Sequence, residues 1–496
     1  MVVNKGGDCI GTTLFNLIAV LFNKIGKFPV DEQKSPISKE KADLYEKLAK
    51  DILRNKIVVK KICSGDKICI NSQDFADIIN ACEKHNDFFL YRSILCQLDV
   101  LIDINELIKA YNYNKIYDGK TPKSFDSLND NVCETGVTII PKVQSLPNTF
   151  FVRDGESVSD KEYRDSNYWY DNINEHFNNI ICIQNIVLNG YSIKNVMIDL
   201  FRDRKREKIV IGVTPCCNDD LNSIMNVKQY CNEETGKQHF EIEGYYDSEA
   251  LTNRFVNILT KAKDNDVDIL MGPEMLGSTE MCETDSMGYN PIFRKKAGCM
   301  PHLVVTPTVW TSGKNFLSVY LNSGELIGQQ YKQNSFEYTD SNERFEENLK
   351  NSPREILLLH IPGWGRIVFP ICVDFLVAKY RDMLARELKA TLMLCPSYSS
   401  GTVQFGNASG SVRDFGTRLV WLNSCSALRK FGDKPETIGL VSVPVTNLGD
   451  IEQNATPIKP QCDGKCSNNC LFTITIQAIS DDNKHCNEVE VKHVPL

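Results

Sequence analysis

Three side chains of different chemistry each stand at the end of an apolar stretch in the second half of this chain. Glu274 follows Ile-Leu-Met-Gly-Pro, Lys332 follows Leu-Ile-Gly-Gln-Gln-Tyr, and Cys372 follows Ile-Val-Phe-Pro-Ile. A thiol can attack a carbonyl carbon, an ammonium can stabilise the oxyanion that forms, and a carboxylate can carry the protons. Together these are the groups that acyl transfer by a cysteine requires.

Each of the three has an ordinary structural explanation when it is taken singly. The chain has 19 cysteines, so one in a buried strand is more often a packing residue than a nucleophile. Glu274 alone would be a helix cap or a salt-bridged residue, and Lys332 alone would be solvated. The joint pattern changes this balance, because Glu, Lys and Cys end strand-like runs in that order, 58 and then 40 residues apart.

The proposed chemistry requires these groups to act on one another. An unperturbed thiol, with a pKa near ~8.5, is mostly protonated at neutral pH. We expect the positive charge of Lys332 to favour the thiolate of Cys372. We expect desolvation to raise the proton affinity of Glu274, which suits it to take the thiol proton and return it to a leaving nitrogen.

The order and contexts of these residues resemble the nitrilase or carbon-nitrogen hydrolase superfamily, over roughly residues 206–496. The resemblance implies an α/β fold, the four-layer α-β-β-α sandwich, and a Glu274-Lys332-Cys372 catalytic triad. It implies a hydrolase of non-peptide C–N bonds that works through a cysteine thioester, with a small amide favoured over a nitrile as substrate. Lys332 and the backbone N–H of Val373 would hold the oxyanion, and no metal or organic cofactor is needed.

Two features depart from the pattern of that superfamily. Members often carry an Arg and a Pro-Glu pair after the nucleophile and its aspartate, whereas residues 375–379 here read Phe-Leu-Val-Ala-Lys. The substrate pocket is therefore not predicted by transfer. Many members also have a second glutamate shortly after the lysine. Glu337 and Glu343 are both candidates, and we favour Glu343 slightly because Arg344-Phe345 follows it.

Residues 1–205 resemble no family, and we predict a mostly helical domain of unknown role. Apolar residues at helical spacing predict three helices, over residues 38–54, 72–82 and 87–111. Two β-branched runs around Gly65-Asp66 predict a hairpin over residues 57–70. Residues 112–165, rich in Asn, Asp, Ser and Pro, are predicted as loops.

A charge-dense stretch at residues 201–208 precedes a clear strand, residues 209–213, and we place the domain boundary between residues 205 and 206. Beyond it, strand-like and helix-like segments alternate, including helices over residues 248–264 and 376–389. Such alternation over about 290 residues predicts an α/β domain with helices covering a sheet.

The composition sets the broad class of protein. A chain of 496 residues is long enough for two domains. A net charge of −8 argues against nucleic acid as a partner. The cysteines are scattered and mostly inside apolar runs, which is typical of reduced thiols and predicts a cytoplasmic protein. The apolar run of residues 13–22 is too short to span a membrane and predicts a core or docking helix.

Cys462, Cys466 and Cys470 form an evenly spaced set, with His485 and Cys486 further on. Their spacing is wider than the C-x2-C of a zinc knuckle, although three thiols and a fourth ligand would suffice for zinc. We favour a cysteine-rich surface loop and leave metal binding open.

A second class of function competes with hydrolysis. Nitrilase-like domains resembling this one also occur joined to unrelated modules in bacterial gene systems, including defence genes. By that analogy the domain would sense a ligand or serve assembly, and residues 1–205 would dock or signal. The superfamily resemblance also implies a homo-oligomer, a dimer or larger.

Overall fold

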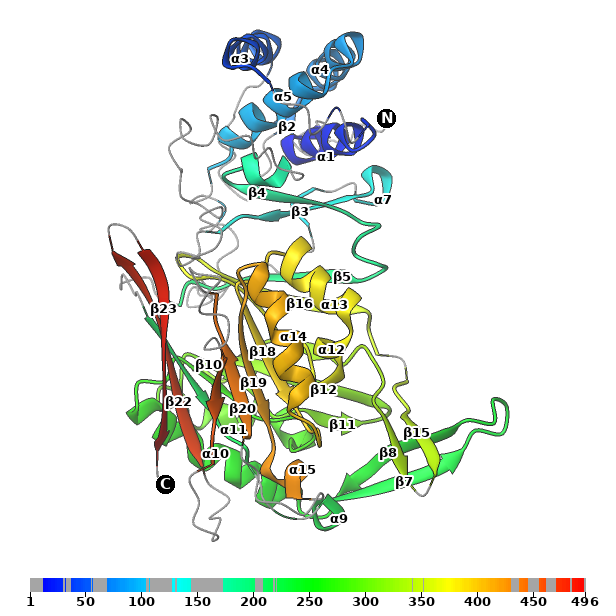
Figure 1. Ribbon diagram of the computed structural model, residues 1–496, viewed down its shortest axis with the longest axis vertical. Helices are drawn as coiled ribbons and strands as arrows, with labels where there is room; N and C mark the ends of the chain where they lie inside the picture. Colours follow the sequence, from blue (N-terminus) through cyan, green and yellow to red (C-terminus); the bar gives the residue numbers. More distant parts are fainter. Residues whose placement is uncertain are drawn as a thin grey trace. The chain divides into compact units, whose positions relative to one another are not determined.

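The computed structural model describes residues 12–29, 32, 37–54, 56, 69–103, 107, 127–129, 132–143, 173–200, 208–216, 219, 221–340, 342–350, 352–429, 437–444, 455–460, 470–481 and 484–494. The chain forms two compact units (Figure 1). The first comprises residues 1–145, 152–199 and 360–364, and the second comprises residues 146–151, 200–359 and 365–496. The boundary predicted at residues 201–208 falls almost wholly outside the described residues.

The first unit combines helices with short strands. Its helices are α1 (Leu14–Ile25), α3 (Lys39–Leu53), α4 (Ser72–His85), α5 (Phe88–Val100) and α7 (Val132–Thr135), and η2 (Ile173–His176) is a 3-10 turn. Its strands are β1 (Thr12–Thr13), paired with β2 (Cys69–Ile70), then β3 (Val137–Pro141), paired with β4 (Ile180–Gln184), and β5 (Ser192–Met197). Asp87 fixes the start of α5, because its Oδ1 accepts the N–H of Phe89 at 2.9 Å.

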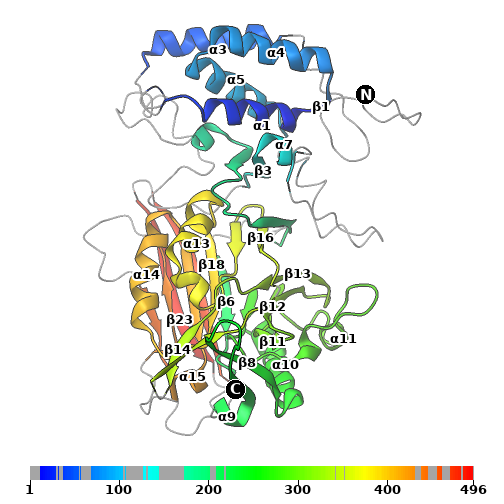
Figure 2. The same ribbon diagram turned by 90° about the vertical axis from the view of Figure 1, so that its right-hand side faces the viewer.

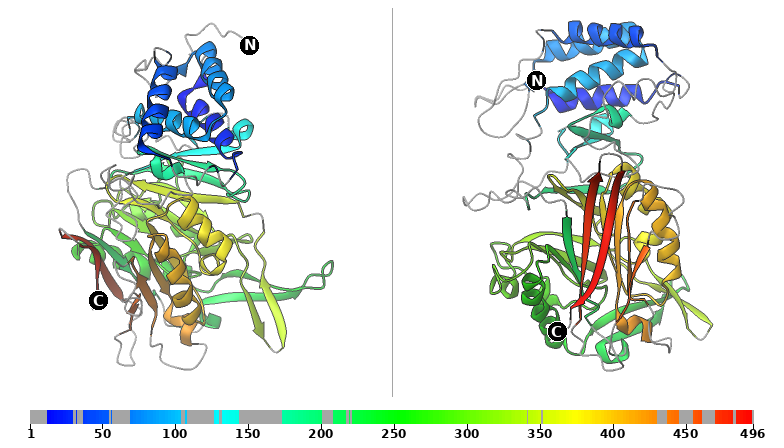
Figure 3. Two further views of the ribbon diagram at one scale, coloured as in Figure 1. Left: turned by 45° about the horizontal axis from the view of Figure 1, so that its top comes forward. Right: turned by 60° about the vertical axis from the view of Figure 1, so that its left-hand side comes forward.

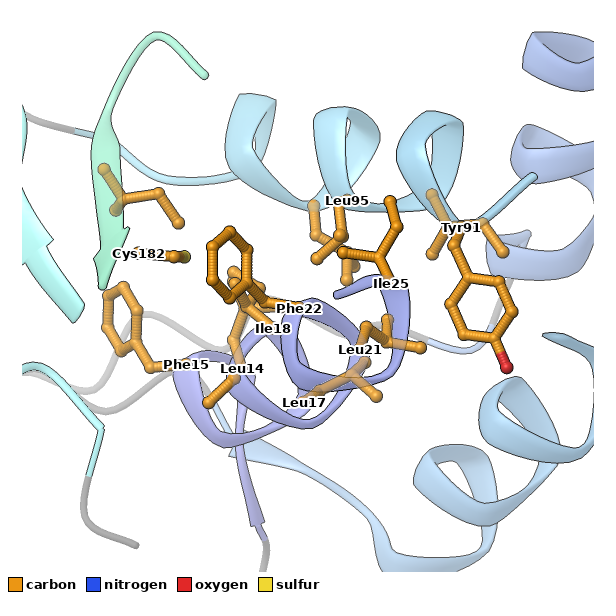
Figure 4. Close-up of a cluster of buried hydrophobic side chains, with 14 of the residues drawn as sticks. Leu14, Phe15, Leu17, Ile18, Leu21, Phe22, Ile25, Tyr91, Leu95 and Cys182 are labelled. Carbon is orange, nitrogen blue, oxygen red and sulfur yellow. The ribbon is translucent and has the colours of Figure 1, made fainter. Parts of the chain in front are cut away.

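Helix α1 supplies the centre of this unit's core. Leu14, Leu17, Ile18 and Leu21 are fully buried, and Figure 4 shows them together with Leu95 and Cys182. The helix predicted from the apolar run of residues 13–22 is therefore confirmed as a core helix.

Two other predictions for this unit are wrong. The helix predicted over residues 87–111 ends at Val100. The loop predicted over residues 112–165 contains β3, whose residues are all buried and pair with β4. A five-residue strand is too short to stand out from its polar surroundings. The hairpin predicted over residues 57–70 lies outside the described residues except for its last two.

The second unit contains three sheets. One has the order β11-β12-β10-β9-β6-β22-β23, with β13 also paired to β12. Its strands are β6 (Lys208–Val213), β9 (Ile269–Met271), β10 (Leu303–Val305), β11 (Val309–Thr311), β12 (Lys314–Leu321), β13 (Leu326–Tyr331), β22 (Leu471–Asp481) and β23 (Lys484–Val494). Figure 3 shows β22 and β23 as long neighbouring strands.

The other two sheets share the remaining strands. Six strands of a seven-stranded sheet belong to this unit, in the order β21-β20-β19-β18-β17-β16. These strands are β16 (Glu355–Ile361), β17 (Gly365–Val368), β18 (Leu392–Ser397), β19 (Arg418–Asn423), β20 (Gly439–Ser442) and β21 (Ala455–Ile458). A four-stranded sheet has the order β14-β15-β8-β7, from β7 (Met225–Cys231), β8 (Gln238–Tyr245), β14 (Glu337–Asp340) and β15 (Glu343–Glu347).

Helices pack on both larger sheets. Phe255 and Leu259 of α10 (Ser248–Asp264) join one buried cluster with Leu270 and Val304 of the eight-stranded sheet. On the seven-stranded sheet, Phe405 of α14 (Val403–Asp414) stacks on Trp421 with ring centroids 4.5 Å apart. Figure 2 shows α13 (Ala378–Asp382) and α14 on one side of the strands, and α10 and α11 (Pro291–Arg294) on the other. The second unit is therefore a mixed α/β structure.

The helix predicted over residues 376–389 is interrupted. Short helix α12 (Val373–Leu376) is followed by α13 and by a π-helical turn, Met383–Glu387. Shorter helices still complete the unit, namely α9 (Leu221–Ile224), η3 (Thr279–Met281) and α15 (Cys425–Arg429). Within the described ranges, none of the helices combines the length and apolar character needed to cross a bilayer.

Candidate active site

The three strand-like runs singled out in the sequence end close together. Glu274 follows β9, Lys332 directly follows β13, and Cys372 lies four residues beyond β17. Backbone hydrogen bonds hold two of these segments against β18. The N–H of Cys372 donates to the carbonyl of Pro396 at 2.9 Å, and the N–H of Glu274 donates to the carbonyl of Ser397 at 3.4 Å. Both larger sheets therefore contribute to one site.

At this site the side chains of Glu274, Lys332 and Cys372 converge. Lys332 Nζ donates to Glu274 Oε1 at 2.8 Å, and the Cys372 thiol lies close enough to both side chains for the charge of each to shift its pKa. Glu274 and Lys332 are fully buried, and Cys372 is 2% exposed. The structure thus brings together the carboxylate, the ammonium and the thiol that the sequence pattern selected.

The second carboxylate on Lys332 belongs to Glu347. Its Oε2 accepts from Lys332 Nζ at 2.6 Å, and the residue is 1% exposed. Glu337 and Glu343, the two candidates from the sequence, are both exposed, and Glu337 pairs with Arg344 instead. Selecting them was wrong.

Strand geometry explains the difference between Glu343 and Glu347. Both are on one face of β15, which buried Phe345 marks as the inward face. At roughly 3.3 Å per residue, however, Glu343 lies about 13 Å from Glu347 along the strand. The period-two pattern from Phe345 places Glu347 on the inward face but does not separate it from Glu343, so the choice depends on how far along β15 the site lies.

Backbone and amide donors fix the two carboxylates. Glu274 Oε2 accepts the N–H of Tyr398 at 2.9 Å, and Glu347 Oε2 accepts that of Phe336 at 3.1 Å. The amide of Asn315, which sequence reasoning missed, donates to Glu274 Oε1 at 2.9 Å and to Glu347 Oε1 at 3.2 Å. Both carboxylates are therefore fixed in position around Lys332.

Burial disfavours the charge of Lys332, but the adjacent carboxylates of Glu274 and Glu347 outweigh it. They hold the pKa of Lys332 well above its usual range. The side chain is consequently an ammonium at neutral pH. This is the state needed beside an oxyanion.

The thiol of Cys372 behaves differently from the sequence expectation. Burial raises its pKa well above the usual value, and the negative charge of Glu274 raises it further, while Lys332 lowers it only in part. Lys332 thus favours the thiolate, as expected, but burial and the charge of Glu274 outweigh it. Before substrate arrives, Cys372 is a neutral thiol beside Glu274.

The backbone at Cys372 is strained, with φ +50° and ψ −111°. A non-glycine residue adopts such a conformation only when its surroundings enforce it, at a cost of about 1–3 kcal/mol. The turn makes Cys372 the residue before α12. In the part of the chain that the structure describes, no acceptor lies on the N–H of Val373, the first helical residue.

Asp374 joins this turn to the segment that carries Lys332. Its Oδ1 accepts the backbone N–H of Asn334 at 2.8 Å, and its Oδ2 accepts that of Ile371 at 3.3 Å. Burial raises the pKa of Asp374 to about 7, although the amide of Asn334 and the charge of Lys332 both act to lower it. The contacts set the spacing between Lys332 and Cys372.

The described residues contain no group of three or more His, Cys, Asp or Glu side chains arranged to hold a metal ion. Cys462 and Cys466 lie outside those residues, as do the side chains of His485 and Cys486. The question of a zinc site in this segment therefore stays open.

No protein-family model and no curated protein matches the chain. Solved structures that it resembles are nitrilase-superfamily proteins. An amidase from Nesterenkonia sp. is 13% identical with a TM-score of 0.32, over 54% of this chain and 90% of that one. Nit3 of Saccharomyces cerevisiae, a member of branch 10 of the nitrilase superfamily, is 14% identical with a TM-score of 0.31, over 48% and 83%. The C. elegans NitFhit protein is 14% identical with a TM-score of 0.34, over 48% and 56%.

Proposed function

We propose that the second unit hydrolyses a non-peptide C–N bond, with an amide favoured over a nitrile, through a thioester on Cys372. The observation that carries this proposal is the buried convergence of Glu274, Lys332 and Cys372, with Lys332 hydrogen-bonded to Glu274 and kept charged, and with both charges acting on the Cys372 thiol. We also propose that this domain is a four-layer α-β-β-α sandwich and that it follows a mostly helical N-terminal domain.

Acylation begins with the neutral thiol. Glu274 takes its proton as Cys372 Sγ bonds to the carbonyl carbon, so a long-lived thiolate is not needed. The resulting oxyanion is stabilised by the Lys332 ammonium and the N–H of Val373. Glu274 then delivers the proton to the leaving nitrogen, the C–N bond breaks, and the acyl group remains on sulfur.

Deacylation reverses these roles with water. Glu274 takes a proton from the attacking water, the second oxyanion forms beside Lys332, and the C–S bond breaks. The proton returns to sulfur, and a carboxylic acid leaves. Glu347 keeps Lys332 in place through both halves, because its Oε2 lies 2.6 Å from Nζ.

The test is incubation of the protein with a panel of small amides and nitriles. Hydrolysis is measured as the release of amine or ammonia and the formation of acid. The account expects turnover of at least one amide by the wild-type protein. Cys372→Ala should lower kcat/KM by roughly a thousandfold or more, because the covalent route is removed. Full turnover in Cys372→Ala would refute the role of this thiol.

We further propose that the protein self-associates as a dimer or larger oligomer. Light scattering during dilution from micromolar concentration should give a mass of at least twice the 56.2 kDa of one chain. A mass of one chain at all these concentrations would reject the proposal.

A further inference from the structure

Asn315, near the start of β12, touches three charged residues of the site. Its Nδ2 lies 2.9 Å from Glu274 Oε1 and 3.2 Å from Glu347 Oε1, and its backbone carbonyl accepts the N–H of Lys332 at 2.8 Å. The residue is fully buried. A single side chain therefore fixes both carboxylates, while its backbone fixes the strand end that carries the ammonium.

The charges explain why such a link is needed. Glu274 and Glu347 both approach the Nζ of Lys332, so two buried negative charges share one positive charge. Two like charges in a buried site repel each other. The two N–H groups of a primary amide offset this repulsion, since each can donate to one carboxylate.

The orientation of the Asn315 side-chain amide also indicates that it serves the two carboxylates. In the described part of the chain, Oδ1 of Asn315 is buried without a donor, an arrangement that costs free energy. The reverse orientation would place this oxygen against both carboxylates. The amide thus leaves its acceptor unsatisfied and keeps both donors on Glu274 and Glu347.

We infer that Asn315 is a positioning residue of the hydrolytic site: its amide holds the carboxylates of Glu274 and Glu347 beside Lys332 and keeps Glu274 in place to accept the Cys372 proton. This inference rests on the proposed function. It assigns to Asn315 a role in hydrolysis, beyond its contribution to packing.

The test compares Asn315→Leu, which removes the amide at similar volume, with Gln330→Leu. Gln330 is a buried amide on neighbouring β13 whose Nε2 donates to the carbonyls of Tyr331 and Glu355, so its loss perturbs packing without changing a carboxylate. Asn315→Leu should lower kcat severalfold or more while changing KM little, because the carboxylate that carries the proton is no longer held in place. The kcat of Gln330→Leu should stay at the wild-type value.

Alkylation of Cys372 by iodoacetamide gives a readout that does not depend on turnover. The charge of Glu274 raises the pKa of the Cys372 thiol. When Glu274 is no longer held beside the thiol, Cys372 of Asn315→Leu should react severalfold faster at neutral pH than in the wild type. Circular dichroism melting confirms folding. Asn315→Ser, with a single O–H donor, is the second variant and should shift both readouts less, in the same direction.

The outcomes separate the inference from the proposed function. If the wild-type protein hydrolyses no amide, the proposed function fails, and the alkylation rate still decides the role of Asn315. A kcat and an alkylation rate indistinguishable from those of the wild type, in a folded Asn315→Leu, would overturn the inference.

Discussion

Replacing Glu274 by Gln should abolish amide hydrolysis and at the same time make Cys372 easier to alkylate. Hydrolysis should fall by about 10² to 10⁴, because the group that moves protons in both half-reactions is lost. Alkylation at pH 7 should become faster because the charge of Glu274 raises the pKa of the Cys372 thiol, while Lys332 lowers it. Two opposite effects from one substitution are the signature of a thiol paired with its base.

The measurement is the second-order rate of iodoacetamide labelling at Cys372, relative to exposed Cys231 in the same protein. Glu343→Gln is the matched control, because it removes an exposed carboxylate from the strand that carries Glu347. The control should hydrolyse and label like the wild type. Slower labelling of Cys372 in Glu274→Gln, or retained hydrolysis, would contradict the assignment of Glu274.

Lys332→Met should have the largest effect on stability. The substitution leaves Glu274 and Glu347 as buried like charges without their shared cation, and breaking such a cluster costs about 3–5 kcal/mol in free energy of unfolding. Hydrolysis should also fall by roughly a hundredfold or more, because the oxyanion loses its ammonium. Urea unfolding and kcat/KM measure the two effects separately.

The double variant Lys332→Met with Glu347→Gln separates charge balance from catalysis. Removing one carboxylate relieves the repulsion, so much of the lost stability should return, whereas hydrolysis should stay low. Recovery of hydrolysis in the double variant would show that Lys332 acts only through charge balance. A double variant no more stable than Lys332→Met would contradict the proposed repulsion between the carboxylates.

The positions of Glu274, Lys332 and Cys372 were predictable because each depends on a local pattern. An apolar run predicts a buried strand, and the polar residue after it lies at the edge of the sheet. Glu347 and Asn315 were not found, because their proximity to Lys332 depends on pairings between distant segments. Glu347 reaches the site through β15, which pairs with β8, and Asn315 lies on β12, which pairs with β13.

The protonation state of Cys372 could not be predicted from the sequence, for a related reason. Lys332 and Glu274 act on the thiol in opposite directions, and burial decides between them. Burial is a property of the assembled site. In the same way, short strand β3 was hidden within polar surroundings because its pairing with β4 joins residues about 40 positions apart.

The central claim is that hydrolysis passes through an acyl group on Cys372. Its most direct test is the mass of the intact protein after rapid acid quenching during turnover of a hydrolysed amide, with fragmentation to locate any adduct. The account predicts an added mass equal to the acyl group, located on Cys372 and missing in Cys372→Ala. Turnover of the amide without any adduct, or with the adduct on another residue, would contradict it.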